Sequence, residues 1–300
     1  MKVIQSFWSK PLQETSSGHI HLRAKGGWLS EELFYVSALL SCLQIKKLYG
    51  EVHLFTDSPG KQLLVDELGI PYSTVSTELD QINHLNEGLW AMGKVLCYSL
   101  QKSPFLHIDQ DFFAFTHFPA NIMEAELVVQ NFDKDAVYYA NVCRVARANT
   151  KRLPAFMQSY LDQSGNLNGV FGCNAGIIGG NDYRFFQDYA HQVYDMVNHA
   201  DFDFNTPDFG LINIFLEQST FYALALKHQK RITPLFEQMD EEFEALLRFE
   251  HLPESGFIHT VGKSKKNILT NEQVYLQLAT DFPDELEQLL NRLKTTQIST

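Results

Sequence analysis

Short apolar segments alternate with helical patterns over the first half of the chain, and this alternation constrains the fold more than any other feature. A β/α succession is typical of a sheet whose parallel strands are joined by crossover helices. The expected strands are Val3–Trp8, Glu51–Asp57, Tyr72–Val75 and Phe105–Ile108. The expected helices are Trp28–Tyr49, Lys61–Leu68 and Leu89–Gln101. We therefore predict an α/β protein with a mixed, mainly parallel sheet flanked by helices.

The second half of the chain is less regular and has longer connections. Its expected strands are Leu127–Gln130, Ala136–Val142, Asn174–Gly180, Arg231–Pro234 and Gly256–His259. Its expected helices are Tyr183–Asn198, Asp208–Gln218 and Glu272–Lys294. Because no repeat, low-complexity tract or linker interrupts the chain, we predict a single domain over residues 1–270. Residues 271–300 are expected to be a C-terminal helical appendage of the same domain.

Composition narrows the functional classes. The chain has 300 residues of which 45% are hydrophobic, enough for a large core. Its net charge of −12 argues against a nucleic-acid partner. It has neither an N-terminal apolar stretch of signal-peptide length nor the run of about eighteen apolar residues that a transmembrane helix needs. Four scattered cysteines without C-x-x-C spacing indicate buried thiols rather than a zinc site or disulfides, so we expect a cytoplasmic protein.

Asp109 and Asp111 end the apolar run Phe105–Ile108 abruptly. Open α/β sheets bind ligands at the carboxyl ends of their strands. Residues two apart on an extended chain point to the same side, so both carboxylates could address one divalent ion that carries a diphosphate. The alternative is an Asp-rich turn, because Asp is common in turns.

Two other segments have the same Asp-x-Asp pattern. Asp133-Lys134-Asp135 follows polar residues, and Asp201-Phe202-Asp203 lies among His, Asn and Pro. Neither is expected to end an apolar strand, so we interpret both as turns or solvated loops. The pattern alone is therefore weak evidence, and its context decides.

The chain resembles the GT-A glycosyltransferases, particularly the glycogenin-like and bacterial sugar-transferring branch (family 8 type). The resemblance rests on ordered motifs over residues 94–265: the helix with Lys94 before the Asp109-Gln110-Asp111 strand end, Asn174-Ala175-Gly176, Asp208-Phe209-Gly210-Leu211-Ile212-Asn213, and His259-Thr260-Val261-Gly262-Lys263-Ser264-Lys265. Motifs in this order are far more specific than any one of them. The resemblance implies a GT-A-like fold.

The resemblance implies a metal site and a diphosphate site. Asp109, Asp111 and His259 would form an O,O,N ligand set for Mg²⁺ or Mn²⁺, and the imidazole favours Mn²⁺. A single histidine such as His259 is more often a core or surface residue than a ligand, and its position in the motif favours the ligand. Gly262 would let the backbone approach the diphosphate, and Lys265 would supply a positive charge to it, although a solvated loop is the alternative.

Lys94 is expected, again by resemblance, to contact the nucleotide sugar, with an exposed helix lysine as the alternative. Asn174 would offer its amide to sugar hydroxyls, although small residues packing under a helix would give the same pattern. Asp208 would lie near the reacting sugar, or would only cap the following helix. Phe209 departs from the family, where Gln is usual, and Glu217 is a weaker substitute for the lost amide.

Strand ends near the N-terminus could line a pocket for the nucleotide base and ribose. Phe7 and Trp8 end the first expected strand, and Asp57 ends the second. The alternative is that these aromatic residues belong to the core.

Together these features predict a metal-dependent glycosyltransferase. The resemblance implies a UDP-linked nucleoside-diphosphate sugar as donor and retention of anomeric configuration. The acceptor would be a carbohydrate, glycan or glycolipid. A sugar nucleotidyltransferase is disfavoured because no Gly-rich basic loop follows the first strand. A catalytically silent nucleotide-sugar or sugar-binding protein is the second hypothesis, which Phe209 keeps open.

Overall fold

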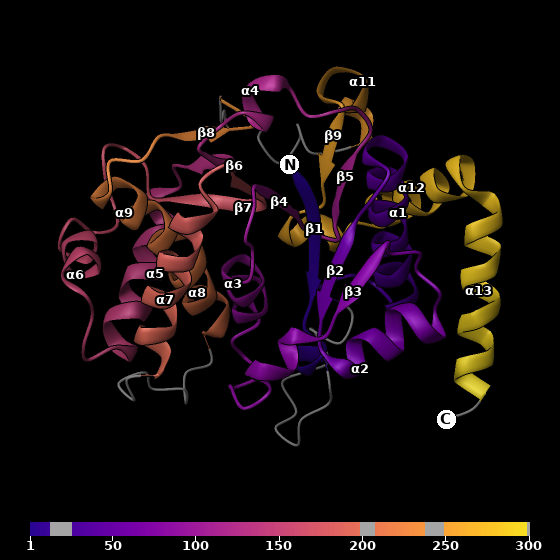
Figure 1. Ribbon diagram of the computed structural model, residues 1–300, viewed down its shortest axis with the longest axis horizontal. Coiled ribbons are helices and arrows are strands. Elements are labelled where there is room, and N and C mark those ends of the chain that lie inside the picture. The colour runs from indigo at the N-terminus through magenta and orange to yellow at the C-terminus, as the bar shows by residue number, and fades with distance from the viewer. Residues whose placement is uncertain (13–25, 199–207, 238–248, 299–300) are drawn as a thin grey trace. The chain divides into compact units, whose positions relative to one another are not determined.

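The computed structural model describes residues 1–12, 26–198, 208–237 and 249–298 (Figure 1). The chain divides into two compact units. Unit 1 comprises Met1–Lys2, Ile82–His107 and Phe118–Asp240, and unit 2 comprises Val3–Gln81, Ile108–His117 and Glu241–Thr300. The single domain predicted over residues 1–270 does not follow this division and stays a prediction.

The main sheet has seven strands in the order β3-β2-β1-β4-β7-β6-β8. The strands are β1 (Lys2–Phe7), β2 (His53–Thr56), β3 (Thr74–Ser76), β4 (Phe105–Ile108), β6 (Leu127–Asp133), β7 (Gly172–Gly180) and β8 (Ile232–Pro234). Parallel pairs join β1 to β2, β2 to β3 and β6 to β8, whereas β6 and β7 are antiparallel. The predicted mixed, mainly parallel sheet flanked by helices is confirmed.

Unit 2 has clear helix boundary signals. The helices are α1 (Glu31–Tyr49), α2 (Ser58–Lys61), which continues as a π-helical turn over Gln62–Glu67, α11 (Leu252–Ser255), α12 (Ile268–Asp281) and α13 (Pro283–Ile298). The Ser30 side chain accepts a hydrogen bond from Leu33 N at 3.2 Å and caps α1, which Gly50 ends with φ +78°. Such caps satisfy backbone groups that a helix end leaves without partners.

The single C-terminal helix predicted over Glu272–Lys294 is wrong, because two helices occupy this region. Pro283 has no backbone N–H, and it restricts the residue before it to extended conformations. Phe282, with φ −144°, therefore separates α12 from α13. In Figure 1 these helices form the yellow end of the chain.

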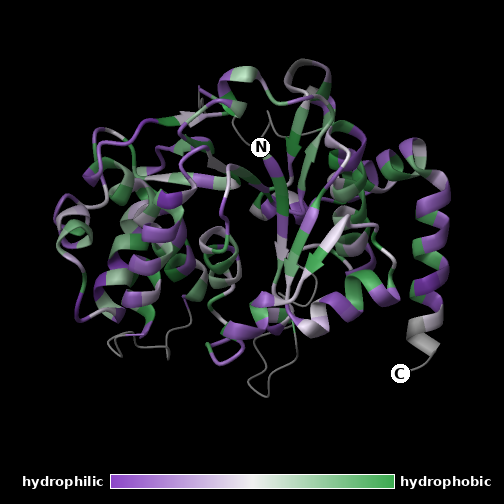
Figure 2. Cartoon of the chain, in the orientation of Figure 1, coloured by the Kyte–Doolittle hydropathy of each residue, from purple (hydrophilic) through white to green (hydrophobic). Residues whose placement is uncertain are grey.

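A second, two-stranded sheet in unit 2 was not fully predicted. The strand β5 (Phe112–Ala114) pairs antiparallel with β9 (Phe257–His259), and Phe112 stands opposite His259. All residues of both strands are buried, and both are largely hydrophobic in Figure 2. Only β9 was expected from the sequence.

Unit 1 is rich in helices. They are α3 (Ala91–Ser99), α4 (Ala120–Met123), α5 (Ala136–Asn149), α6 (Ala155–Asp162), α7 (Tyr183–Asn198), α8 (Phe209–Ile214) and α9 (Thr220–Lys227). The strand predicted over Ala136–Val142 is wrong, since this segment is the first half of α5. The carboxylate of Asp135 accepts from Tyr138 N at 2.9 Å and caps that helix. Its buried residues Tyr139, Val142, Cys143 and Ala146 follow helical spacing.

A π-helical turn, Phe215–Ser219, joins α8 and α9 into one apolar stretch. Among the described residues this stretch, Phe209–Lys227, is the one with the length and mean hydropathy of a membrane-spanning helix. Within it, 67% of the apolar window is buried in the protein. Core helices of globular proteins have the same properties, so the stretch is weak evidence for a membrane span.

Candidate functional site

Asp109 and Asp111 lie at the carboxyl end of β4, but they lie on a turn and not on extended chain. Phe112 N donates to Asp109 O at 3.0 Å, which closes the turn between β4 and β5. The expected extended conformation of this segment is therefore wrong, although the two carboxylates still lie close enough to share one ion. The turn instead reverses the chain, so that Asp111 immediately precedes the two-stranded sheet that contains His259.

Serine side chains of α1 hydrogen-bond to the backbone of this turn and hold it in place. Ser41 Oγ, on the buried face of α1, donates to Phe112 O at 2.7 Å and accepts from Gln5 Nε2 at 2.8 Å. One helical turn earlier, Ser37 Oγ donates to Gln110 O at 2.9 Å. Sequence reasoning missed these residues. Two serines spaced four apart among the apolar residues of α1 are the signal that could have found them.

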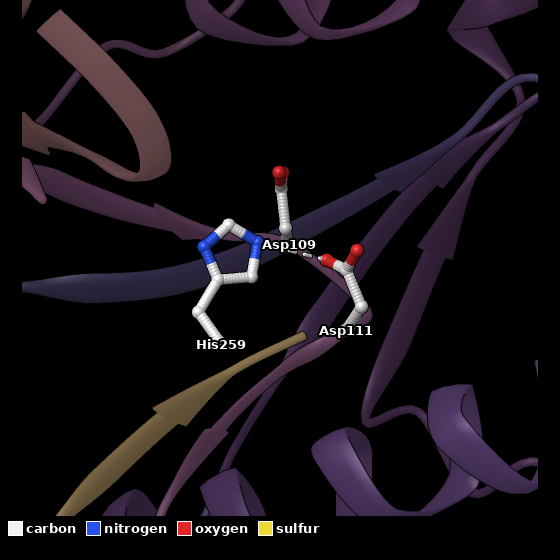
Figure 3. A group of neighbouring side chains, drawn as sticks. All are labelled: Asp109, Asp111 and His259. Atoms are coloured by element: carbon white, nitrogen blue, oxygen red, sulfur yellow. Dashed lines mark ion pairs between the residues drawn. The ribbon is translucent and has the colours of Figure 1, made fainter. Parts of the chain in front are cut away.

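His259 meets Asp111 because β9 pairs with β5. The imidazole Nε2 of His259 lies 3.3 Å from Asp111 Oδ1 (Figure 3). Thr260, the next residue, donates both its backbone N–H and its hydroxyl to Asp111 O, each at 3.0 Å. These bonds hold the histidine beside the carboxylate, although the two residues are distant in sequence.

Asp109, Asp111 and His259 form a group that fits one metal ion. Each offers one ligand atom, and these atoms all lie within 4.8 Å of one another. His259 is buried and the two aspartates are half-buried, so a bound ion would be reachable from one side. Two carboxylates and an imidazole suit a hard divalent ion such as Mg²⁺ or Mn²⁺. The structure therefore confirms that the three predicted ligands lie together.

Lys265 is the fourth predicted residue that the structure places here. Its ammonium group forms an ion pair with Asp111, donates to Gly26 O at 3.2 Å and lies 5.9 Å from the centre of the Trp28 ring. Burial of Asp111 would raise the pKa of its carboxyl group, but the charges of Lys265 and His259 outweigh burial and hold this pKa far below its ordinary value. Asp111 is therefore ionised at neutral pH, as a metal ligand must be.

Gly262 begins a short 3₁₀ turn, Gly262–Lys266, between His259 and α12. It has φ +50°, a conformation that glycine adopts readily, and no atom lies within 4 Å of the position of a Cβ. Lys263 and Lys266 are exposed, unlike the half-buried Lys265. The contact of Gly262 with a diphosphate stays a prediction.

In unit 2, the residues predicted to line a nucleotide pocket are buried or take part in local hydrogen bonds. Phe7 and Trp8 are each 6% exposed. The Asp57 carboxylate accepts from Ser9 Oγ at 2.7 Å, from Ser9 N at 3.1 Å and from Gly60 N at 3.0 Å, and thereby caps α2. Their contact with a base or ribose stays a prediction.

Three predicted site residues belong to unit 1. Lys94 Nζ lies 3.5 Å from Ala175 O and therefore beside the Asn174-Ala175-Gly176 segment of β7. Asn174 Oδ1 accepts from Gly176 N at 2.9 Å, so it also shapes its own strand. Asp208 precedes α8, but its side chain makes no capping hydrogen bond, which removes the main support for a purely capping role. The roles of all three in sugar binding stay predictions.

Phe209, the departure from the family pattern, packs against Gly88. A Cβ at Gly88 would lie 2.4 Å from the Phe209 ring, so glycine makes room for this aromatic side chain. Asn213 of the same motif is fully buried, accepts from Ala91 N at 2.8 Å and donates to Gly88 O at 2.8 Å. This motif therefore attaches α8 to the start of α3.

Comparisons with known proteins concern the whole chain. The model of a family of unknown function (DUF6734) matches residues 1–292. No curated protein matches the sequence.

Solved structures that are similar in shape include three transferases. Mouse xyloside xylosyltransferase 1 in its apo form has 12% identity and a TM-score of 0.39, with 90% of this chain and 98% of that chain covered. The glycosyltransferase GlyE of Streptococcus pneumoniae TIGR4 has 10% identity and a TM-score of 0.45, covering 97% and 63%. The galactosyltransferase LgtC, in complex with donor and acceptor sugar analogues, has 10% identity and a TM-score of 0.43, covering 96% and 100%.

Proposed function

The chain belongs to this family of unknown function, DUF6734. We propose that it is a metal-dependent glycosyltransferase whose donor is a UDP-linked nucleoside-diphosphate sugar. One observation carries the proposal. Asp109, Asp111 and His259 converge at the end of a buried strand with ligand atoms within 4.8 Å, and Lys265 contacts the same cluster. A cation site with an adjacent lysine suits a ligand that is itself a polyanion, as a diphosphate is.

The chemistry of transfer explains why such charges would be needed. Breaking the anomeric C–O bond leaves negative charge on the departing diphosphate, so cations placed there stabilise the transition state more than the ground state. Asp109, Asp111 and His259 would hold Mn²⁺ or Mg²⁺, which supplies charge neutralisation when bound. Lys265 would place a second positive charge near the phosphate oxygens. Gly262 would leave room for them beside the backbone.

The sugar-binding end of the reaction is assigned by the resemblance of the motifs. We propose that Lys94 contacts the donor, that Asn174 binds sugar hydroxyls and that Asp208 lies near the reacting carbon. Retention of anomeric configuration and a carbohydrate, glycan or glycolipid acceptor are part of the same proposal. We further propose that the protein acts in the cytoplasm.

A donor screen tests the proposed function. Purified protein is incubated with Mn²⁺ and each of a panel of UDP-sugars, and free UDP is measured with and without EDTA. Slow hydrolysis suffices, because a transferase without its acceptor commonly passes the sugar to water at a low rate. We expect UDP release from at least one donor that EDTA abolishes.

The alternative of a silent binding protein predicts a different result. Phe209 packs on Gly88 and offers no amide, so the loss of catalysis would be traced first to this residue. Mn²⁺-dependent UDP binding without UDP release from any donor would replace the transferase by a silent binder. Absence of both binding and release would reject the whole proposal.

A further inference from the structure

A lysine and a glutamate form a buried ion pair in unit 1. Lys94 Nζ on α3 lies 3.1 Å from Glu217 Oε1, which belongs to the π-helical turn Phe215–Ser219. The Glu217 side chain is 1% exposed and that of Lys94 is 14% exposed. Any ligand that approaches this pair would therefore reach the ammonium group and not the carboxylate.

Neighbouring groups hold the Glu217 carboxylate and backbone in place. The hydroxyl of Tyr98, one turn beyond Lys94 on α3, donates to the same Oε1 atom at 3.2 Å. The hydroxyl of Tyr189 on α7 donates to Glu217 O at 3.0 Å. Glu217 is thus held by its neighbours, and it in turn restrains the longer Lys94 side chain.

The same helical stretch also fixes the backbone from which Lys94 extends. Asn213 lies one turn before Glu217 and accepts from Ala91 N at 2.8 Å at the start of α3. Lys94 lies one turn after Ala91. Asn213 therefore fixes the position of α3, and Glu217 fixes the position of the Lys94 side chain on it.

Buried ion pairs are weak stabilisers, because desolvation of two charges offsets most of their attraction. Stability therefore does not explain this pair well. Lys94 is the side chain that also lies 3.5 Å from Ala175 O, at the centre of the Asn174-Ala175-Gly176 segment. A cation fixed beside small residues of a strand suits the binding of an anionic ligand.

We propose that Glu217 is a positioning residue for sugar transfer: its carboxylate holds the ammonium group of Lys94 in one place for the anionic nucleotide-sugar donor. The inference rests on the proposed function and deepens it. It assigns a role to a glutamate outside the family motifs, in the same helical stretch as Phe209.

Steady-state kinetics with a double-mutant cycle test the inference. Glu217→Gln keeps the shape of the side chain and its bond from Tyr98 but removes the charge. We expect the KM for the UDP-sugar to rise about tenfold, the effect of one hydrogen bond to a charged group, with a smaller change in kcat. Lys94→Met should raise KM at least as much. In the Lys94→Met background, Glu217→Gln should add nothing further, because its effect passes through the lysine.

Several variants separate positioning from a role in folding. A merely structural glutamate would reduce the fraction of active enzyme and hence kcat, and its effect would be the same with or without Lys94. Glu217→Asp should restore part of the lost affinity for donor. Lys102→Met, an exposed lysine just beyond α3, is the matched control and should leave KM unchanged. If Glu217→Gln does not fold, Tyr98→Phe removes one hydrogen bond to the carboxylate and should raise KM by about threefold.

The outcomes distinguish this inference from the proposed function. Wild-type protein that releases no UDP from any donor refutes both. Wild-type turnover with an unchanged KM in Glu217→Gln, or an equal effect of that change in both backgrounds, refutes the positioning role alone.

Discussion

Asp109–Asp111 and Asp133–Asp135 share the Asp-x-Asp pattern; the first follows the buried strand β4, and the second begins at the last residue of β6. At the first segment, residues from far along the chain meet Asp111: His259 at 3.3 Å and the ammonium group of Lys265. At the second, the partners are local, since Asp133 Oδ1 accepts from Asp135 N at 3.2 Å and Asp135 caps α5. Distant partners make the first segment a candidate metal site, whereas local partners make the second a strand-to-helix connection.

Burial acts in the same direction on both segments, but the result is opposite. Burial raises the pKa of the Asp133 carboxyl group, and hydrogen bonds from the backbone and from Tyr139 oppose it only in part. At Asp111 burial is outweighed by Lys265 and His259, so the pKa is lowered. The difference teaches that nearby cations, and not the spacing of two aspartates, keep a half-buried carboxylate ionised.

Removal of a ligand should give the largest difference between the two segments. Asp111→Ala and His259→Ala should each weaken Mn²⁺ binding by about 100-fold, since each removes one of three protein ligands. Isothermal titration with Mn²⁺ measures the affinity. Asp133→Ala is the matched control and should bind as wild type does. Equal affinity in all of these proteins would overturn the three-ligand site.

Loss of Lys265 should change the affinity for Mn²⁺ and the affinity for UDP in opposite directions. Lys265→Met removes the cation that occupies Asp111, so Mn²⁺ affinity without nucleotide should rise, while Mn²⁺-dependent UDP affinity should fall about tenfold. Titrations with Mn²⁺ and with UDP measure the two effects. Lys134→Met, the exposed lysine inside the second segment, should change neither. If UDP affinity is unaffected by the loss of Lys265, this lysine does not serve the phosphates.

The helix cap at the second segment should affect stability alone. Asp135→Ala removes the acceptor for Tyr138 N and should lower the free energy of unfolding by about 1 kcal/mol, with no change in Mn²⁺ affinity. Urea denaturation measures the loss. Asp135→Asn retains a capping oxygen and should recover most of it. A loss of metal affinity in Asp135→Ala would show that the two segments are not functionally distinct.

The smallest expected effect is a pH dependence at Asp133. Its raised pKa means that the folded state binds this proton more tightly than the unfolded state does. Its contribution to stability is therefore fully present below the unfolded pKa and is lost as pH rises through the folded pKa. Asp133→Asn should raise the Tm relative to wild type more at pH 7 than at pH 4, as measured by thermal unfolding. Asp162→Asn, whose side chain is 63% exposed, is the control and should show no such trend.

Much of the architecture could be predicted because its signals are local. The strand β4 and the helix α7 follow directly from apolar runs and periodicity, and they were found at their observed positions. The α5 segment was mistaken for a strand because Val137, Tyr138 and Tyr139 favour strands by propensity, whereas the Asp135 cap and tertiary packing decide for a helix. The end of β6 was also misjudged, since this strand continues through polar residues to Asp133.

The site residues that belong to family motifs could be predicted from the sequence. The contacts that depend on tertiary packing could not. Motif order identified His259 as a partner of Asp109 and Asp111. The strand β5 and the turn before it depend on a distant partner, because in the part of the chain that the structure describes Phe112–Ala114 pairs with β9. The ion pair of Lys94 and Glu217 likewise depends on the packing of two helices. Asp201-Phe202-Asp203 lies outside the described residues.

The pairing of β5 with β9 has a consequence for synthesis of the chain. A ribosome releases Asp109 and Asp111 long before His259, so a nascent chain that ends before β9 has two carboxylates and an unpaired β5 edge. It lacks the imidazole and the Thr260 bonds that complete the cluster. Tight binding of the proposed metal ion would therefore require synthesis of the chain through β9.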